Sequence, residues 1–275
     1  MERLQNILSH RGVASRRGAA SMIEEGRVTV DGEVVREPGA RFDPDTVNVA
    51  VDGRPVAAAE RVRTIMMYKP AGVLSTMEDP FGGKTVADLI RGRIFERLVP
   101  VGRLDKESEG LLLMSNDGDL TYRLTHPRFE HEKTYIVRAA GRWTDEKLAV
   151  LRGSVEMPDG YRTRPVPVEV VRIGTDNVHV LCFTLREGRK RQIRYMCSAA
   201  HLVVLSLKRV AIGALRLPDD LTPGTWRELT DRERALLFEI RPASRPSVTQ
   251  PARSARREGP SRATPPNRGP SRMRW

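Results

Sequence analysis

The clearest fold signal in this chain is the segment Val101-Gly102-Arg103-Leu104-Asp105-Lys106-Glu107-Ser108-Glu109-Gly110-Leu111-Leu112-Leu113. The apolar run at 110–114 is too short for a typical helix and predicts a fully buried strand. The polar residues before this run predict a loop that follows an earlier strand. A buried strand that anchors such a loop holds one carboxylate, Asp105, in a fixed position. Taken locally, Asp105 also fits a loop aspartate that caps a turn, and this alternative stays open.

The surrounding residues, 61–241, predict a domain that contains both strands and helices. Strand patterns lie at 64–68, 110–114, 134–139, 168–173, 178–185 and 203–212. Helical patterns lie near 85–91, 117–124, 144–152, 189–200 and 231–239. Because the strands outnumber the helices and do not strictly alternate with them, we expect an α+β fold with a mixed, mainly antiparallel sheet and not a doubly wound fold.

Residues 1–60 predict a separate compact unit. Two short helical patterns are separated by residues 12–15, in which glycine ends the first helix and Ser15 is a typical N-cap of the second. The apolar residues of 28–35 flank Asp31-Gly32, which predicts a hairpin with a type I′ turn. Residues 47–51 predict a further strand.

The net charge of the chain is +12, and its distribution is informative. Residues 242–275 contain eight arginines and one glutamate, which gives +7 and leaves +5 on the remaining body. This segment also contains seven prolines and almost no apolar residues, so it predicts a disordered tail. A basic body with a more basic tail favours a polyanionic partner. The lack of a membrane-type amphipathic helix favours nucleic acid over lipid.

Several classes of protein are excluded by what the sequence lacks. No run approaches the ~20 apolar residues of a membrane helix, and residues 1–5 lack the apolar segment of a secretory signal, so we expect a cytoplasmic protein. The two cysteines, Cys182 and Cys197, predict small buried side chains. The histidines show no ligand spacing, so we expect no metal. Gly82-Gly83-Lys84-Thr85 is not a phosphate loop, because Glu78 stands where such a loop needs glycine. With no metal or nucleotide motif in the sequence, we expect no cofactor.

Two further segments carry functional chemistry. Tyr135 begins a predicted strand, and an aromatic side chain at a nucleic-acid site stacks on an unpaired base, although an ordinary core tyrosine is the local alternative. Residues 186–194 contain five basic side chains in nine positions. These residues lie where a helix is predicted to begin after Gly188. Because helix N-termini and adjacent arginines both bind phosphate, the pattern favours a phosphate site over a basic surface that is merely solvated.

Together, these segments resemble the RsuA-type family of ribosomal RNA pseudouridine synthases over about residues 1–240. The similar motifs are, in chain order, Lys69-Pro70-Ala71-Gly72-Val73, the Gly-Arg-Leu-Asp sequence of 102–105 with the leucines that follow it, Lys133-Thr134-Tyr135, Glu187 to Arg194, Ile212-Gly213 and residues 223–227. Residues 1–60 resemble an S4 (αL-like) RNA-binding domain, particularly at 12–17 and 26–28. The resemblance therefore implies an S4 domain at 1–60, a catalytic domain at 61–241 and a tail at 242–275.

The resemblance also implies a role for each matched position. Asp105 would be the essential carboxylate, Tyr135 would stack on the target base and take part in proton transfer, and Arg194 would pair with Asp105. Ile193 would pack beside the tyrosine, and Arg103 would hold the RNA around the displaced nucleotide. Further RNA contacts are expected from Arg189, Lys133, Lys69, Arg11, Arg16, Arg17 and Arg27. Lys190 and Tyr195 depart from the family pattern, in which Asn and Arg are common. Neither is at a proposed catalytic position, so we expect these departures to change RNA contacts and hence site preference.

The implied activity is the isomerisation of one ribosomal RNA uridine to pseudouridine by base flipping, glycosidic cleavage and C–C re-attachment. The long basic tail favours the large subunit (23S rRNA), and ribosomal RNA or an assembling ribosomal subunit is the expected partner of a monomeric enzyme. A non-catalytic S4-type RNA-binding or ribosome-assembly protein is the alternative. It explains the first domain and the charge, but it does not explain why the three motifs around Asp105, Tyr135 and Arg194 occur together.

Overall fold

The structure of the chain is a computed structural model, described here for residues 1–57 and 60–239. The expected disordered tail, residues 242–275, lies outside the described residues. Within the two described ranges, no helix combines the length and apolar character that a bilayer-crossing segment requires.

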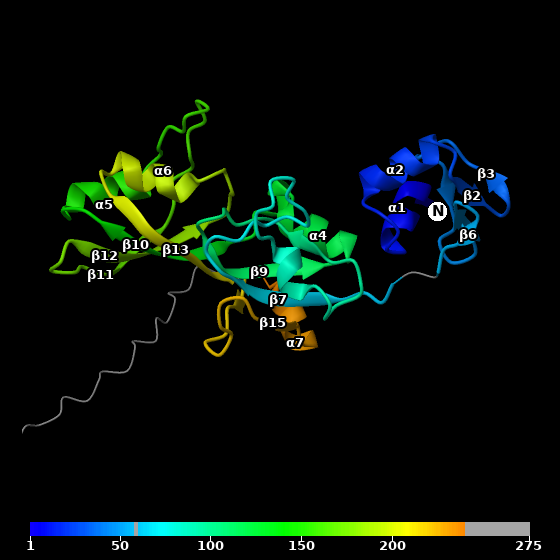
Figure 1. The fold of residues 1–275 in the computed structure, drawn as a ribbon. Coiled ribbons are helices and arrows are strands. Elements are labelled where there is room, and N and C mark those ends of the chain that lie inside the picture. Colours follow the sequence, from blue (N-terminus) through cyan, green and yellow to red (C-terminus); the bar gives the residue numbers. More distant parts are fainter. Residues whose placement is uncertain (58–59, 240–275) are drawn as a thin grey trace, which may run out of the picture. The chain divides into compact units, whose positions relative to one another are not determined.

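Residues 1–57 form a small α+β unit with its own hydrophobic cluster (Figure 1). Its elements are β1 (Glu2–Arg3), α1 (Leu4–His10), α2 (Arg16–Glu24), β2 (Val28–Val30), β3 (Glu33–Val34), β4 (Arg41–Phe42), β5 (Val49–Val51) and β6 (Arg54–Pro55). The backbone N–H of Gly18 donates to Ser15 Oγ at 3.0 Å, so the predicted N-cap of α2 is confirmed. Asp31 and Gly32 join β2 to β3 with φ angles of 50° and 91°, the left-handed conformation that a type I′ turn requires.

Residues 60–239 contain a nine-stranded sheet in the order β11-β12-β10-β13-β9-β7-β15, with β8 paired to β9 and β14 to β13. Its elements are β7 (Thr64–Lys69), α3 (Val86–Ile90), β8 (Val99–Val101), β9 (Glu109–Ser115), α4 (Gly118–Thr125), the short helix η1 (Pro127–Phe129), β10 (Lys133–Ala140), α5 (Asp145–Arg152), β11 (Val168–Arg172), β12 (Val178–Leu185), α6 (Gln192–Ala199), β13 (Val203–Ile212), β14 (Leu215–Arg216), β15 (Trp226–Glu228) and α7 (Asp231–Leu236). Strands β13 and β9 run parallel and the other pairs run antiparallel, so the prediction of a mixed, mainly antiparallel sheet is confirmed.

Two predicted helix boundaries are wrong by three residues. The helix predicted near 231–239 ends at Leu236, and the second difference is at α6. The pattern at 189–200 predicted a helix from residue 189, but α6 begins at Gln192. Arg191 has a φ of 57°, in the left-handed region, and a residue in that conformation cannot continue the hydrogen-bonding pattern of a right-handed helix. Residues 189–191 therefore lie in a loop before α6. The short strands β14 and β15 escaped prediction because two or three residues are too few to show a periodic pattern, whereas β8 is the earlier strand that was expected before the Asp105 loop.

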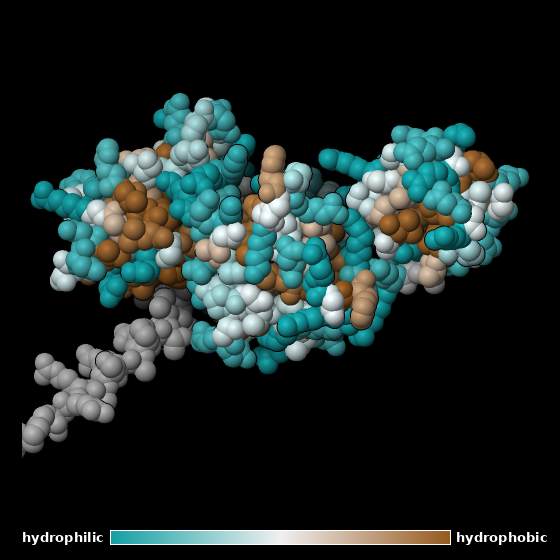
Figure 2. Space-filling model, viewed as in Figure 1, coloured by the Kyte–Doolittle hydropathy of each residue, from teal (hydrophilic) through white to brown (hydrophobic). Residues whose placement is uncertain are grey.

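Strand β9 separates two hydrophobic clusters. Leu112 and Met114 belong to one cluster, and Leu111 and Leu113 belong to the other. Successive strand residues point to opposite faces, so a strand that is buried on both faces needs an unbroken apolar run. Helices α5 and α6 lie on one face of the sheet near β10 and β13 (Figure 1). Figure 2 shows hydrophilic residues over most of the visible face, interrupted by hydrophobic patches.

Gly110 allows β9 to approach β13 closely. Its φ is 103°, and a Cβ atom added there would lie 2.3 Å from the carbonyl oxygen of Arg209. Glycine has no side chain and adopts this conformation without strain, so it permits the parallel pairing of β9 with β13. This pairing fixes the start of β9, directly after the loop that carries Asp105. The two cysteines, Cys182 and Cys197, are buried and unbridged, as predicted.

Candidate active site

Asp105 lies half-buried in the loop between β8 and β9. The segment after β7 holds this loop in place. The Ser75 hydroxyl donates to the carbonyl oxygen of Leu104 at 2.9 Å and accepts from the N–H of Leu104 at 3.1 Å. The N–H of Gly72 donates to the carbonyl oxygen of Lys106 at 2.7 Å. The residues on both sides of Asp105 are thereby fixed, which gives the carboxylate a defined position.

Lys69 lies beneath the same loop and is fully buried. Its Nζ donates to the carbonyl oxygens of Ser108 at 2.7 Å, Pro70 at 3.0 Å and Lys106 at 3.4 Å. Burial lowers the pKa of Lys69 to about 8, and the negative charge of Asp105 acts against this shift. The expectation that Lys69 contacts RNA is therefore wrong for this structure, because all of its donor capacity is directed at backbone oxygens inside the protein.

A pocket of about 330 Å³ brings together residues from three separate segments of the sequence. Asp105 reaches it from its loop, Tyr135 from β10 and Ile193 from α6. Tyr135 and Ile193 are 9% and 3% exposed, so they form an apolar wall, while Arg103 and Arg189 line the pocket from exposed loop positions. Five of the site residues that the family motifs implied, namely Arg103, Asp105, Tyr135, Arg189 and Ile193, therefore line one pocket.

The predicted pair between Arg194 and Asp105 is not formed in the structure. Arg194 Nη2 donates instead to the carbonyl oxygen of Glu107 at 3.4 Å, two residues beyond Asp105. The Glu107 carboxylate accepts from Arg191 at 2.9 Å. Within residues 1–57 and 60–239, no ion-pair partner of Asp105 is found, and the buried Nε of Arg194 has no hydrogen-bond partner. Arg194 therefore lies beside the Asp105 loop with an unused donor.

The residues before α6 are held by a partly buried polar network that the sequence did not indicate. Gln192 Nε2 donates to the Glu187 carboxylate at 2.6 Å, and the Tyr161 hydroxyl donates to the same carboxylate at 2.7 Å. The guanidinium of Arg189 lies 3.7 Å from the centroid of the Tyr161 ring, which orients it at the mouth of the pocket. Arg103 makes no side-chain hydrogen bond or ion pair within the described residues, so its guanidinium is available to a ligand.

Two basic residues adjoin the pocket on β10 and β13. The Lys133 ammonium donates to the carbonyl oxygen of His131 at 2.9 Å, and burial lowers the pKa of Lys133 to about 8. Arg209 is 3% exposed, and its Nε donates to the carbonyl oxygen of Leu111 at 2.8 Å. Sequence reasoning missed Arg209, although a charged residue within the apolar pattern at 203–212 was an available signal.

The four arginines predicted to bind RNA in residues 1–57 differ in their surroundings. Arg11 donates to the carbonyl oxygens of Pro44 and Val47 at 2.8 and 3.1 Å, which is a structural role and not the expected RNA contact. Arg16 and Arg17 are exposed in the first turn of α2, and their side chains form no hydrogen bond or ion pair within the described residues.

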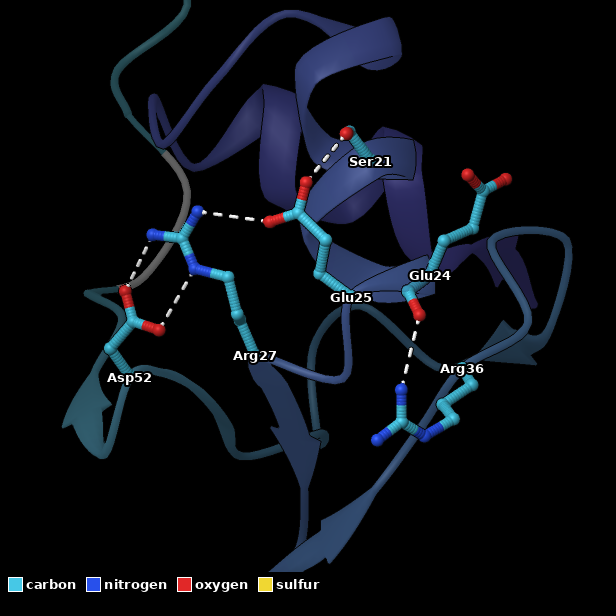
Figure 3. Close-up of polar contacts among 6 residues, drawn as sticks. All are labelled: Ser21, Glu24, Glu25, Arg27, Arg36 and Asp52. Atoms are coloured by element: carbon cyan, nitrogen blue, oxygen red, sulfur yellow. Dashed lines mark hydrogen bonds and ion pairs between the residues drawn. The ribbon is translucent and has the colours of Figure 1, made fainter.

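Arg27 is exposed but already paired, as Figure 3 shows. Its guanidinium donates to both oxygens of Asp52 at 2.9 and 2.7 Å and to Glu25 at 3.3 Å. The hydrogen bonds from Arg27 lower the pKa of the Asp52 carboxyl, so the pair is charged at neutral pH. An RNA phosphate would have to compete with these carboxylates, which makes Arg27 a weaker candidate for RNA binding than Arg16 or Arg17.

Comparisons with known proteins agree with this arrangement. Residues 63–199 match the RNA pseudouridylate synthase family, and residues 2–47 match the S4 domain. An uncharacterized RNA pseudouridine synthase of Aquifex aeolicus is 42% identical over 238 residues, which cover 86% of this chain and 94% of the relative. Ribosomal large subunit pseudouridine synthase B of Bacillus subtilis is 38% identical, with 85% of this chain and 94% of the relative covered.

The same relationship appears in three dimensions. A crystal structure of a pseudouridylate synthase superimposes with a TM-score of 0.61 at 25% sequence identity, covering 86% of this chain and all of the other. The family match spans the strands and helices that carry Asp105, Tyr135 and Ile193. With its fold, its motifs and relatives of similar length in agreement, this chain belongs to the RNA pseudouridine synthase family and carries an S4 domain.

Proposed function

We propose that this enzyme isomerises one uridine of large-subunit (23S) ribosomal RNA to pseudouridine, with Asp105 as the carboxylate that acts at the sugar. The observation that carries this proposal is the pocket in which Asp105, Tyr135 and Ile193 meet. The choice of the large subunit is supported by the names of the Bacillus subtilis and Pseudomonas aeruginosa relatives, each called ribosomal large subunit pseudouridine synthase B.

The substrate uridine has to leave the RNA stack before it can enter this pocket. Extruding a nucleotide costs a few kcal/mol of stacking and pairing energy. The Tyr135 ring supplies a surface on which the extruded base stacks, and Ile193 packs beside it. The guanidinium groups of Arg103 and Arg189 hold the RNA around the displaced nucleotide, since phosphate contacts from arginine favour the complex.

The reaction conserves all atoms. The bond between N1 of uracil and C1′ of ribose breaks, the base turns, and C5 bonds to C1′; C5 gives up its proton and N1 gains one. Bond breaking builds positive character on the sugar, as in glycoside hydrolysis. An ionised Asp105 stabilises that charge, adds to C1′ or assists proton abstraction from the sugar, and each of these roles needs its negative charge. Tyr135, next to the base, takes part in the proton transfer.

Two cations lie close to the loop that carries Asp105. Lys69 lies under the loop as a buried cation, and Arg194 lies beside the loop through its contact with the Glu107 carbonyl. A nearby cation favours the ionised carboxylate, and exclusion of water strengthens that effect. We propose that substrate binding brings the unused donor of Arg194 to Asp105, which would complete the pair expected from the motif.

The S4 domain, which we assign to residues 1–60, serves as an affinity module for the RNA. Its exposed Arg16 and Arg17 are the proposed contacts. The catalytic domain is assigned to 61–241. The partner is ribosomal RNA or an assembling ribosomal subunit, which places the reaction in the cytoplasm and within ribosome biogenesis, and the enzyme acts as a monomer.

The decisive experiment incubates the full chain with transcripts of large- and small-subunit ribosomal RNA and maps pseudouridine by carbodiimide labelling and primer extension. We expect one modified uridine in the large-subunit transcript. Asp105→Asn should lower the rate by about 10²–10⁴-fold or more, whereas Asp119→Asn, at an exposed position of α4, should leave it unchanged. Binding without conversion by the wild-type chain would support the non-catalytic alternative, and an active Asp105→Asn variant would exclude the proposed mechanism.

A further inference from the structure

A second and larger pocket, of about 630 Å³, adjoins the pocket that contains Asp105. The two pockets share Arg103, Tyr135 and Arg189 as lining residues. This volume lies within the range of about 300–1,000 Å³ that is usual for ligand sites in proteins. A ligand that fills both pockets therefore passes directly over Tyr135.

Four cationic side chains line the second pocket and not the first: Lys133, Arg164, Arg186 and Arg209. Arg164 and Arg186 are paired with Glu130 and Glu132, which leaves Arg209 and Lys133 without an acidic partner among the described residues. Arg209 lies on β13 opposite Tyr135 of β10, and Lys133 lies two residues before Tyr135 on the same strand. Arg209 is 3% exposed, and its Nη2 is buried with no hydrogen-bond partner in the part of the chain that the structure describes. A buried donor without a partner is costly, so this atom is poised to bond with a ligand.

Arg209 and Lys133 also repel each other. Burial, followed by the charge of Arg209, lowers the pKa of Lys133. Neither side chain forms an ion pair with any carboxylate of residues 1–57 and 60–239. Like charges that are held close together and partly out of water are unfavourable until an anion binds between them.

The carboxylates that line this pocket are already engaged. Glu130 pairs with Arg164, and Glu187 accepts hydrogen bonds from Tyr161 and Gln192. Burial, followed by the charge of Lys133, lowers the pKa of His131, which is therefore neutral at physiological pH. An anion that enters the pocket consequently meets Arg209, Lys133 and Arg103 as uncompensated cations, and no free carboxylate among the described lining residues.

We propose that Arg209 and Lys133 form a phosphate subsite that binds the RNA backbone next to the target uridine, with the attached nucleotide in the second pocket. The proposal rests on the proposed function, in which RNA is the polyanion that reaches Tyr135. A phosphate matches the donors present, since guanidinium presents several N–H groups in a fixed geometry and ammonium adds a point charge. The shared wall of Tyr135 places this phosphate beside the extruded uridine.

The test measures the dissociation constant of the full chain for a large-subunit ribosomal RNA transcript at several salt concentrations, with no turnover required. Lys133→Met should weaken binding about tenfold and reduce the slope of log Kd against log salt by about 0.7–0.9. Lys133→Arg should keep the wild-type slope. Lys147→Met is the matched control: Lys147 also donates to a backbone carbonyl, that of His201 at 3.2 Å, but it does not line this pocket.

An unchanged salt slope in Lys133→Met would overturn the subsite, because a purely structural lysine releases no counterion. A second measurement uses an RNA oligonucleotide that carries the mapped uridine, with one neutral methylphosphonate at each flanking phosphate in turn. One such position should weaken binding to the wild-type chain and have little further effect on Lys133→Met; no such position would also overturn the proposal. A chain that shows these binding effects but forms no pseudouridine would instead overturn the proposed function alone.

Discussion

Lys69 Nζ lies 2.7 Å from the carbonyl oxygen of Ser108, directly under the loop that carries Asp105. The lysine reaches two more carbonyl oxygens, of Pro70 and Lys106, so one side chain holds three backbone groups. This arrangement makes Lys69 a positioning residue for Asp105, and it accounts for a charged side chain that is completely buried.

We expect Lys69→Met to lower kcat by about 10²-fold. Without the lysine the Asp105 loop loses its support, and a displacement of a catalytic group by about 1 Å costs about 10²-fold in rate. The Kd for RNA should change little, since Lys69 has no exposed surface. Single-turnover rates and equilibrium binding, measured on the same preparation, separate the two effects. A variant that loses affinity but keeps kcat would contradict the positioning role, and a melting curve checks that the variant is folded.

Gly110→Ala should destabilise the chain by about 3 kcal/mol or more, because it combines backbone strain with a clash. The added Cβ would lie 2.3 Å from the Arg209 carbonyl oxygen, at a φ of 103°. Gly160→Ala provides the control, because Gly160 has a φ of 78° but open space around it. This control should lose only about 1 kcal/mol. Urea unfolding measures both values, and equal losses would show that the close approach of β13 is unimportant.

The stability of the C-terminal part of the catalytic domain should depend on acid pH through Glu233. Its carboxylate accepts from Arg227 at 2.8 and 2.6 Å, and these bonds lower its pKa from 4.5 to about 2. The unfolded chain therefore binds the proton more readily, so the contribution is complete above pH 4.5 and is lost as the pH falls towards 2.

Glu233→Gln should accordingly lower the unfolding free energy by about 1–2 kcal/mol at pH 7, with a difference that shrinks below pH 4.5. Glu156→Gln is the control. Glu156 pairs with Arg162 at 3.7 Å, both side chains are mostly exposed, and such pairs contribute about 0.5 kcal/mol or less. Denaturant titrations across this pH range would refute the prediction if the Glu233→Gln difference stayed constant.

RNA affinity should fall as the pH rises above 8. Lys133, whose pKa burial and the charge of Arg209 lower to about 8, loses its proton there, whereas the pKa of His131 is lowered below its ordinary value of 6.5 and lies outside this range. Bound phosphate favours the charged lysine, so the decline begins somewhat above pH 8. Lys133→Arg should bind RNA with a flatter pH dependence than wild type, because arginine does not titrate in this range. Equal pH profiles for the two proteins would contradict this assignment.

Replacing Arg16 and Arg17 together with alanine should weaken RNA binding, while Arg11→Ala should mainly lower stability. The first two side chains are exposed, whereas Arg11 bonds the carbonyl oxygens of Pro44 and Val47. Loss of two phosphate contacts should reduce the salt slope by about 1.4–1.8. Binding isotherms measure the affinity of these variants, and thermal melting measures their stability. The prediction would be refuted if Arg11→Ala mainly lost affinity and the Arg16 and Arg17 variant mainly lost stability.

The fold and much of the site could be predicted because they depend on patterns along the chain. The apolar run of β9 indicates burial on both faces, and the motifs around Asp105 and Tyr135 are local in sequence. Side-chain direction is not local. Lys69 was expected at the RNA surface, but its position at the end of the buried strand β7 turns it inward.

The contacts of Arg194 and Arg209 were not predicted for the same reason, because they depend on the direction of side chains from distant segments. The family resemblance implied that Arg194 meets Asp105, but the left-handed conformation of Arg191 sets where α6 begins, and Arg194 bonds the Glu107 carbonyl instead. Arg209 lies at the site because the register of β10 and β13 pairs it with Tyr135, and the sequence does not show this register. Contacts of this kind depend on strand pairing between distant segments, which a single sequence does not reveal.

The alternation of side chains along β9 has a consequence for how such enzymes diversify. The cluster that contains Leu112 and Met114 also contains Leu104, Tyr135 and Ile193, which back the Asp105 pocket. The cluster on the opposite side supplies Val101, Leu124 and Ile212 to the second pocket. One strand therefore separates the apolar side chains that back the first pocket from those that only the second pocket uses, with Tyr135 lining both. A directed-evolution library can accordingly randomise the Val101, Leu124 and Ile212 side while the side that backs Asp105 stays fixed.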